Sequence, residues 1–167
     1  DSYAHAIYAF TLDWNANSNL VADDTVQELL IAADGEAAHA LLLDPTNTLA
    51  LAFSAEILVD QQKWTQAQQN IEKALQSDAN HVEANNYAGL IYMNKKLYAS
   101  AIGYFHKATS LDPKYTAPLY NLGILNYEQK LYTQALEYFN MTLQVDPHHA
   151  DACNYIGLVY HDQKLWD

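Results

Sequence analysis

The chain has 167 residues, of which 50% are hydrophobic and 12% aromatic, enough for a packed core, and this composition excludes a disordered chain. Its single cysteine excludes an internal disulfide framework. The formal net charge of −12 disfavours nucleic acid and anionic membranes as partners, because both attract clustered cations.

Residues 1–62 hold ten acidic side chains and no Lys or Arg, whereas residues 63–167 hold ten acidic side chains and 8 Lys. Such a surface favours solubility and, where it binds a protein, a basic partner. No apolar run reaches the roughly 18 residues that span a bilayer, so we expect no membrane insertion. No signal-peptide pattern is present, and we expect a cytoplasmic protein.

The first 47 residues predict an irregular helix pair. Apolar spacing predicts a helix within residues 1–14, and the Asn-rich stretch 15–24 predicts a loop. Asp24 is expected to cap a helix over residues 25–43. We interpret residues 1–47 as a degenerate repeat or a capping helix pair, since terminal units of repeat proteins are atypical.

From Thr48 onward the sequence repeats with a period of 34 residues. Such a period predicts one supersecondary unit per repeat. The predicted units are residues 48–81, 82–115 and 116–149, followed by a partial repeat over residues 150–167. Two helices are expected in each full unit and one in the partial unit. The predicted helices span residues 49–61, 65–77, 83–94, 98–111, 117–129, 132–145 and 151–163.

Small and large residues recur at fixed places in this frame. Gly89 and Gly123 fall in the middle of first helices, where glycine is unfavourable unless another helix passes too close for a side chain. Phe105 and Phe139 fill the complementary places on second helices. Asn126 stands where the other units have a large residue, so the pattern leaves the packing of that unit open.

This small-large-small pattern, with Asp112-Pro113 and Asp146-Pro147 closing two units, resembles the tetratricopeptide repeat family. The resemblance covers residues 48–167, and residues 25–47 more loosely. It implies an all-α fold, an α-solenoid of antiparallel helix pairs in a right-handed superhelix. It also implies that the first helices line a concave groove for a partner peptide, and that the domain is not itself catalytic.

Catalytic motifs are missing from the sequence: no phosphate-binding glycine loop, no nucleophile elbow and no His-Glu-x-x-His pair. We therefore expect no enzyme activity and no cofactor. His148, His149 and Cys153 have a metal-like spacing, but the histidines follow Pro147 in a turn and Cys153 takes a place that such repeats pack inward. No metal is expected there.

The repeat register places polar side chains around an apolar floor on the first helices. Asn amides can pair with the backbone of an extended peptide whatever its sequence, and carboxylates suit Lys or Arg on the ligand. The expected groove residues are Glu83, Asn86, Leu90, Asn94, Tyr120, Asn121, Ile124, Tyr127, Glu128, Asn154 and Leu158. The same face includes Glu56, Asp60, His161 and Asp162.

None of the eight lysines falls on this face. Some tetratricopeptide proteins hold a chaperone's terminal carboxylate with groove cations, and the resemblance does not extend to that function here. Asn121 resembles one rung of the asparagine ladder of O-linked N-acetylglucosamine transferases, but Tyr87 and Tyr155 occupy the equivalent places.

We therefore expect a protein-binding scaffold or adaptor, working as part of a larger chain or complex. One alternative is an acidic secretion-type chaperone that shields a segment of its client. Another is the substrate-recruiting arm of a larger enzyme, such as a glycosyltransferase, whose catalytic domain lies outside these residues.

Overall fold

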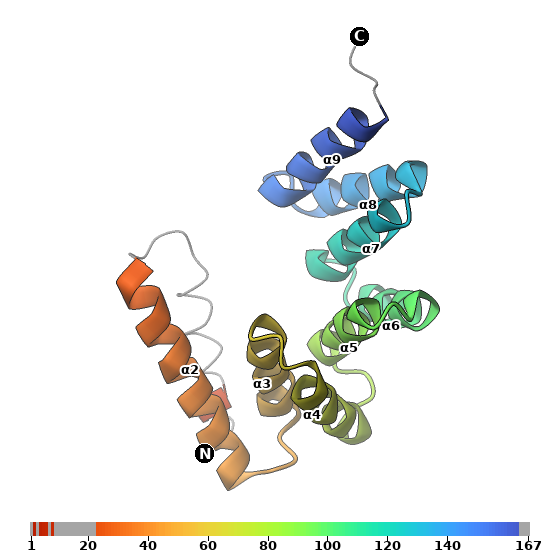
Figure 1. Ribbon diagram of the computed structural model, residues 1–167. Coiled ribbons are helices and arrows are strands. Elements are labelled where there is room, and N and C mark those ends of the chain that lie inside the picture. Colours follow the sequence, from red (N-terminus) through yellow and green to blue (C-terminus); the bar gives the residue numbers. More distant parts are fainter. Residues whose placement is uncertain (1, 3, 7, 9–22, 164–167) are drawn as a thin grey trace. The chain divides into compact units, whose positions relative to one another are not determined.

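The computed structural model describes residues 2, 4–6, 8 and 23–163, and every regular element in that part of the chain is a helix (Figure 1). Residues 2, 4–6 and 8 are helical. The helices that follow are α2 (Asp23–Leu43), α3 (Thr48–Asp60), α4 (Trp64–Ser77), α5 (Val82–Asn94), α6 (Tyr98–Leu111), α7 (Thr116–Glu128), α8 (Tyr132–Val145) and α9 (Ala150–Asp162). The predicted all-α architecture of helix pairs is confirmed.

The chain divides into two compact units, Asp1–Tyr87 and Ala88–Asp167. In the first unit, α2 packs on α3 and α3 packs on α4. In the second unit, α6 packs on α7, α7 on α8, and α8 on α9. Within each unit, these helices pack on their neighbours in sequence, as a repeat of helix pairs requires.

Helices α6 and α8 have the predicted bounds, α4 and α5 begin one residue before the predicted start, and α3, α7 and α9 lie one residue earlier than predicted at both ends. The prediction for α2 is wrong at its start. Asp23 and Asp24 both lie inside the helix, so Asp24 does not cap it; an acidic residue is also favourable in the first turn. The loop predicted over residues 15–24 therefore loses its last two residues, and the rest of it lies outside the described residues.

The turn inside each unit ends its first helix with a residue in the left-handed conformation. These residues are Gln62, Lys96 and Lys130, with φ of 58°, 59° and 61°. In the last of them, the Lys130 N–H donates to the Tyr127 carbonyl at 2.8 Å and the Leu131 N–H to the Asn126 carbonyl at 2.9 Å. This is a Schellman motif, which satisfies carbonyl groups that the helix end would leave unpaired.

An aspartate ends the second helix of each unit and shapes the turn to the next. The Asp112 carboxylate accepts from the Lys114 N–H at 2.9 Å, and the Asp146 carboxylate from the His148 N–H at 3.0 Å. Asp44 makes the same contact with the Thr46 N–H at 2.9 Å. The turn that follows α2 therefore resembles the turns that end the later repeats.

Among the described residues of the first unit, small apolar clusters join α2 and α3. One contains Ala33, Ala37, Phe53 and Ile57, with Leu29 packed against it. The other joins Ala6, from the short helical segment before α2, to Ala40 and Ala50. Alanines at these contacts let the helix backbones approach closely.

In the second unit, Gly89 of α5 and Gly123 of α7 each lie against a phenylalanine of the following helix, whereas a Cβ on Gly157, at the equivalent place in α9, would meet nothing within 4 Å. A Cβ placed on Gly123 would lie 2.5 Å from Cδ1 of Phe139, and one on Gly89 would lie 2.5 Å from Cδ1 of Phe105. Both phenylalanines are fully buried, so their rings have no room to move aside. The predicted close approach is confirmed at both glycines.

Gly123→Ala should destabilise the protein by about 1–3 kcal/mol, because the new methyl group overpacks the contact with Phe139. Gly103→Ala is the matched control, since Gly103 is exposed in the middle of α6 and a Cβ there meets nothing within 4 Å. It should stabilise by about 0.5–1 kcal/mol through helix propensity. Urea unfolding measures both; shifts of the same sign would contradict the packing account.

Lys130→Gly should stabilise the protein by about 0.5–1 kcal/mol, because glycine relieves the left-handed conformation that a side chain makes costly. Gln129→Gly, one residue earlier, should destabilise it, since Gln129 has a φ of −82° that any residue adopts. Thermal unfolding of the two variants gives the comparison. A stabilising Gln129→Gly would show that flexibility of the turn, not its φ, controls stability.

Candidate functional site

The first-helix face of the second unit is built on α7, where Tyr120, Ile124 and Tyr127 are spaced four and three residues apart and so share one side of the helix. All three pack against the cluster of Ala135, Phe139, Ala152 and Val159 and are only partly buried by it. Their outer parts remain accessible on the face that the repeat register predicts for the groove.

Tyr155 of α9 lies at the centre of these aromatic side chains. Its ring meets Tyr120 edge-on at 5.7 Å and Tyr127 edge-on at 5.5 Å between centroids. On its other side it stacks on the buried ring of Phe139 at 5.3 Å. Such geometries are favourable for aromatic pairs, so the tyrosines form a fixed surface rather than mobile side chains.

Polar contacts at one end of this surface tie α7 to α9. The Tyr127 hydroxyl donates to the Asp162 carboxylate at 2.7 Å, and His161 Nδ1 lies 3.3 Å from the other carboxylate oxygen. The hydrogen bond raises the pKa of Tyr127 to about 12, with burial and the negative charge adding to it. The same hydrogen bond, followed by the one from His161, lowers the pKa of the Asp162 carboxyl.

Tyr120 occupies the other end, where its ring lies 4.9 Å from that of His149 and 6.0 Å from that of Phe139. Burial raises its pKa to about 12, and the nearby Tyr155 and Asp151 contribute in the same direction. The Tyr120 hydroxyl is therefore uncharged over the whole physiological pH range.

The other residues expected in the groove of this unit differ in accessibility. Asn94, Glu128 and Asn154 are exposed, and Leu158 is 45% exposed. Leu90 is partly buried against the cluster around Phe105. Asn121 is only 8% exposed and already has an interaction partner, so most of its amide faces the protein.

In the first unit, the expected groove residues are similarly mixed. Asn86 is 2% exposed and has a partner within the protein. Glu83 is partly exposed, and its carboxylate lies 3.3 Å from Nδ1 of His81. Asp60 is exposed and Glu56 half-buried.

Sequence reasoning did not include Tyr155 among the groove residues, although the structure brings it between Tyr120 and Tyr127. The repeat register could have indicated this role, because Tyr155 lies 34 residues after Asn121 and so takes the equivalent position on the next first helix. In the sequence, a tyrosine at the position equivalent to Asn121 interrupts the expected row of asparagines, so the repeat pattern alone does not mark it as a groove residue. Its role becomes visible only when its neighbours across the helix contact are known.

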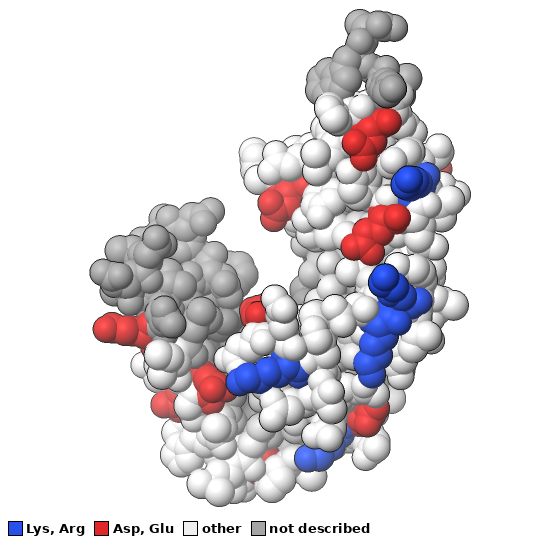
Figure 2. All heavy atoms as spheres, in the orientation of Figure 1, with Lys and Arg blue, Asp and Glu red and all other residues white. Residues whose placement is uncertain are grey.

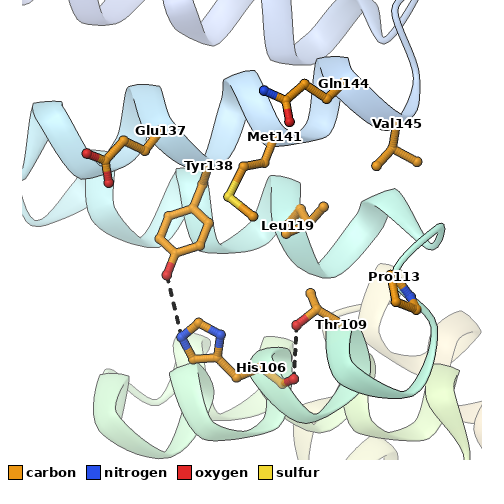
Figure 3. A pocket seen from close by; sticks show the side chains of 9 residues that line it. All are labelled: His106, Thr109, Pro113, Leu119, Glu137, Tyr138, Met141, Gln144 and Val145. Carbon is orange, nitrogen blue, oxygen red and sulfur yellow. Dashed lines mark hydrogen bonds between the residues drawn. The ribbon is translucent and has the colours of Figure 1, made fainter.

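A pocket of about 440 Å³ also lies away from the first-helix face, between α6 and α8. In Figure 3, Tyr138 and Met141 extend from α8 toward His106 and Thr109 of α6. The Tyr138 hydroxyl lies 3.4 Å from Nε2 of His106. Leu119, Pro113, Glu137, Gln144 and Val145 complete the lining. Sequence reasoning missed this pocket because its lining comes from three helices and one turn.

Charge is sparse on the first helices. Helices α3, α5, α7 and α9 contain no Lys or Arg. On the face drawn in Figure 2, acidic and basic side chains form separate small groups on a surface that is mostly uncharged. The acidic side chains of the first helices are Glu56, Asp60, Glu83, Glu128, Asp151 and Asp162.

The expectation that Cys153 packs inward is wrong. Cys153 is exposed on α9, whereas the equivalent Leu119 is 6% exposed and Leu51 2% exposed. His149 is used locally, since its Nδ1 accepts from the Ala152 N–H at 3.3 Å and caps α9.

The sequence profile of the tetratricopeptide repeat matches residues 54–116 and 98–150, together more than half of the chain. The chain belongs to the tetratricopeptide repeat family. Members of this family generally serve as non-catalytic scaffolds for protein interactions. No curated protein sequence matches the chain.

Solved structures of tetratricopeptide proteins have the same fold. The crystal structure of MamA superposes with a TM-score of 0.67 at 22% identity, over 83% of this chain and 81% of that one. YrrB, a TPR protein with an unusual peptide-binding site, gives 0.61 at 22% identity, over 98% and 78%. The first TPR of Spaghetti (RPAP3), bound to the HSP90 peptide SRMEEVD, gives 0.64 at 18% identity, over 72% and 96%.

Within the described part of the chain, none of the helices has the length and hydropathy needed to cross a bilayer.

The raised pKa values of Tyr120 and Tyr127 predict a loss of stability at alkaline pH. The folded pKa values of Tyr120 and Tyr127 are about 12, whereas the unfolded value is about 10. Their contribution to the free energy of unfolding is therefore fully present below pH 10 and is lost as pH rises toward 12. Tyrosinate absorbance should show both rings titrating late. Asp162→Ala should move the late titration of Tyr127, but not that of Tyr120, toward pH 10. Equal effects on both rings would contradict the assignment.

Proposed function

We propose that this protein is a non-catalytic scaffold that binds a segment of a partner protein along the first-helix face of its second unit. The observation that carries the proposal is the fixed aromatic surface of Tyr120, Tyr127 and Tyr155, flanked by exposed polar and apolar side chains. Family membership supports the general role of protein binding.

Rigidity of this surface favours binding. The tyrosine rings pack against Phe139 and against one another, so little side-chain freedom remains to be lost when a ligand docks. Tyrosine also offers a large amphipathic contact area. The surface is therefore suited to an extended peptide that lays apolar side chains on the rings.

Other exposed residues of the expected groove suit the remainder of such a ligand. Leu158 is 45% exposed on α9 and offers an apolar contact. Asn94 and Asn154 are exposed, and their amides can pair with backbone donors and acceptors of a peptide. Asn121 contributes mainly to the packing of the face, because little of its side chain reaches solvent.

Charge favours a basic ligand. Glu128 and Asp162 are exposed carboxylates on this face, and no Lys or Arg occurs on the first helices. A ligand with Lys or Arg beside its apolar residues meets complementary charge, whereas an acidic tail meets repulsion. A terminal carboxylate would find no cation on these helices.

Leu158→Lys should weaken peptide binding at least about tenfold, because it replaces an apolar contact with a charge that repels a basic ligand. Fluorescence anisotropy against a panel of labelled basic and acidic peptides provides the measurement. Met141→Lys is a matched control: Met141 is 43% exposed but lines the pocket between α6 and α8. It should leave the affinity unchanged.

The reverse pattern, with binding lost in Met141→Lys and kept in Leu158→Lys, would place the ligand on the second helices instead. If only acidic peptides bind, the argument for a basic ligand is refuted, but the assignment of binding to the first-helix face is not. Circular dichroism of both variants confirms that each remains folded, so that lost binding is not lost structure.

The role of the scaffold in a cell depends on its partner. Capture with the parent chain and with Leu158→Lys, followed by mass spectrometry, separates the three possibilities. Several subunits of one complex support an assembly adaptor, a single apolar client supports a chaperone, and enzyme substrates support a recruiting arm. Only proteins lost in Leu158→Lys count as ligands of this face.

A further inference from the structure

Three side chains with metal-binding atoms meet at the start of the first unit, far from the tyrosine surface in sequence. Glu36 and His39 lie three residues apart on α2 and so on one face of the helix. His5 lies beside them, with Nδ1 at 2.5 Å from Oε2 of Glu36. The rings of His5 and His39 are 4.2 Å apart between centroids, and one ligand atom from each residue lies within 4.8 Å of the other two.

Neighbouring contacts support the position of His5. Ala6 is fully buried and packs with Ala40 of α2 and Ala50 of α3. Asn47, which caps α3, donates from its Nδ2 to the Ser2 hydroxyl at 3.2 Å. The segment that carries His5 is therefore attached on both sides to the elements that carry or adjoin Glu36 and His39.

From this arrangement we propose that His5, Glu36 and His39 form a binding site for a divalent zinc ion. Two imidazoles and one carboxylate are a common ligand set for zinc. They suit magnesium and calcium poorly, since those ions prefer sets made of oxygen atoms. The site is independent of the peptide-binding proposal and uses none of its residues.

Small side-chain movements are enough to admit the ion. Zinc lies about 2.0–2.2 Å from nitrogen and oxygen ligands in a tetrahedral site, which places the ligand atoms about 3.4 Å from one another. His5 and Glu36 would separate from their hydrogen-bond distance, and the remaining atoms would move closer. The side chains of His5 and Glu36 are 31% and 29% exposed, and His39 is exposed. These side chains can therefore rotate, and an ion can reach them from solvent.

Binding would tie two parts of the chain together. His5 and Glu36 are 31 residues apart in sequence, and only the folded chain brings them together. An ion that binds the folded state alone stabilises it by mass action. Three protein ligands leave a fourth position for water or for a ligand from a partner.

Isothermal titration of the metal-free 167-residue chain with zinc chloride tests the proposal. Cys153→Ser is made first, because an exposed thiol beside His149 could bind zinc separately. We expect one zinc per chain with a Kd of about 10 μM or tighter, and a rise in the unfolding temperature of several degrees. His39→Ala and Glu36→Gln should each weaken binding at least tenfold.

His148→Ala is the matched control, since it removes an exposed histidine outside the cluster and should leave the affinity unchanged. Magnesium chloride should produce neither heat of binding nor a shift in melting. Three results would each overturn the site: no saturable zinc binding at 100 μM, unchanged binding in His39→Ala, or a loss of binding in His148→Ala. Because His39 is exposed, its variant is expected to fold, and circular dichroism verifies that it does.

Discussion

The close contact between a mid-helix glycine and a phenylalanine of the next helix is the constraint on which each repeat of the second unit depends. Gly89 and Gly123 leave room for the rings of Phe105 and Phe139, which are fully buried. A single methyl group would break this fit, because protein interiors are close-packed. In the first unit, Ala55 and Ile71 hold the same places and are also buried, a milder form of the same small-large pairing.

The helix ends are fixed by separate, local interactions. A left-handed residue at Gln62, Lys96 or Lys130 reverses the chain within a unit, and an aspartate carboxylate closes the turn between units. These features satisfy backbone groups that the ends of the helices leave unpaired. The helices therefore begin and end at repeated places even where the packing between them varies.

The core and the proposed binding face are joined through Tyr155. One side of its ring stacks on Phe139, which fills the space left by Gly123, and its edges meet Tyr120 and Tyr127. The surface offered to a ligand thus depends on the same contact that holds the repeat together. The pocket between α6 and α8 is a separate feature: its Tyr138 packs against the cluster around Phe105, and the Tyr138 hydroxyl lies 3.4 Å from Nε2 of His106.

The sequence by itself determined the bounds of the helices after residue 47 to within one residue, and the pairing of Gly89 and Gly123 with phenylalanines, because a 34-residue period encodes both locally. Only the tertiary structure decided which side chains reach solvent. Asn121 is buried, Cys153 is exposed, and Tyr155 lies between two other tyrosines. Asn126, which stands where the other units have a large residue, is buried and donates a hydrogen bond to the Leu122 carbonyl at 2.7 Å. The tertiary structure also brought His5 to Glu36 and His39. Exposure and proximity depend on neighbours distant in sequence, and a periodic pattern of residue types does not contain them.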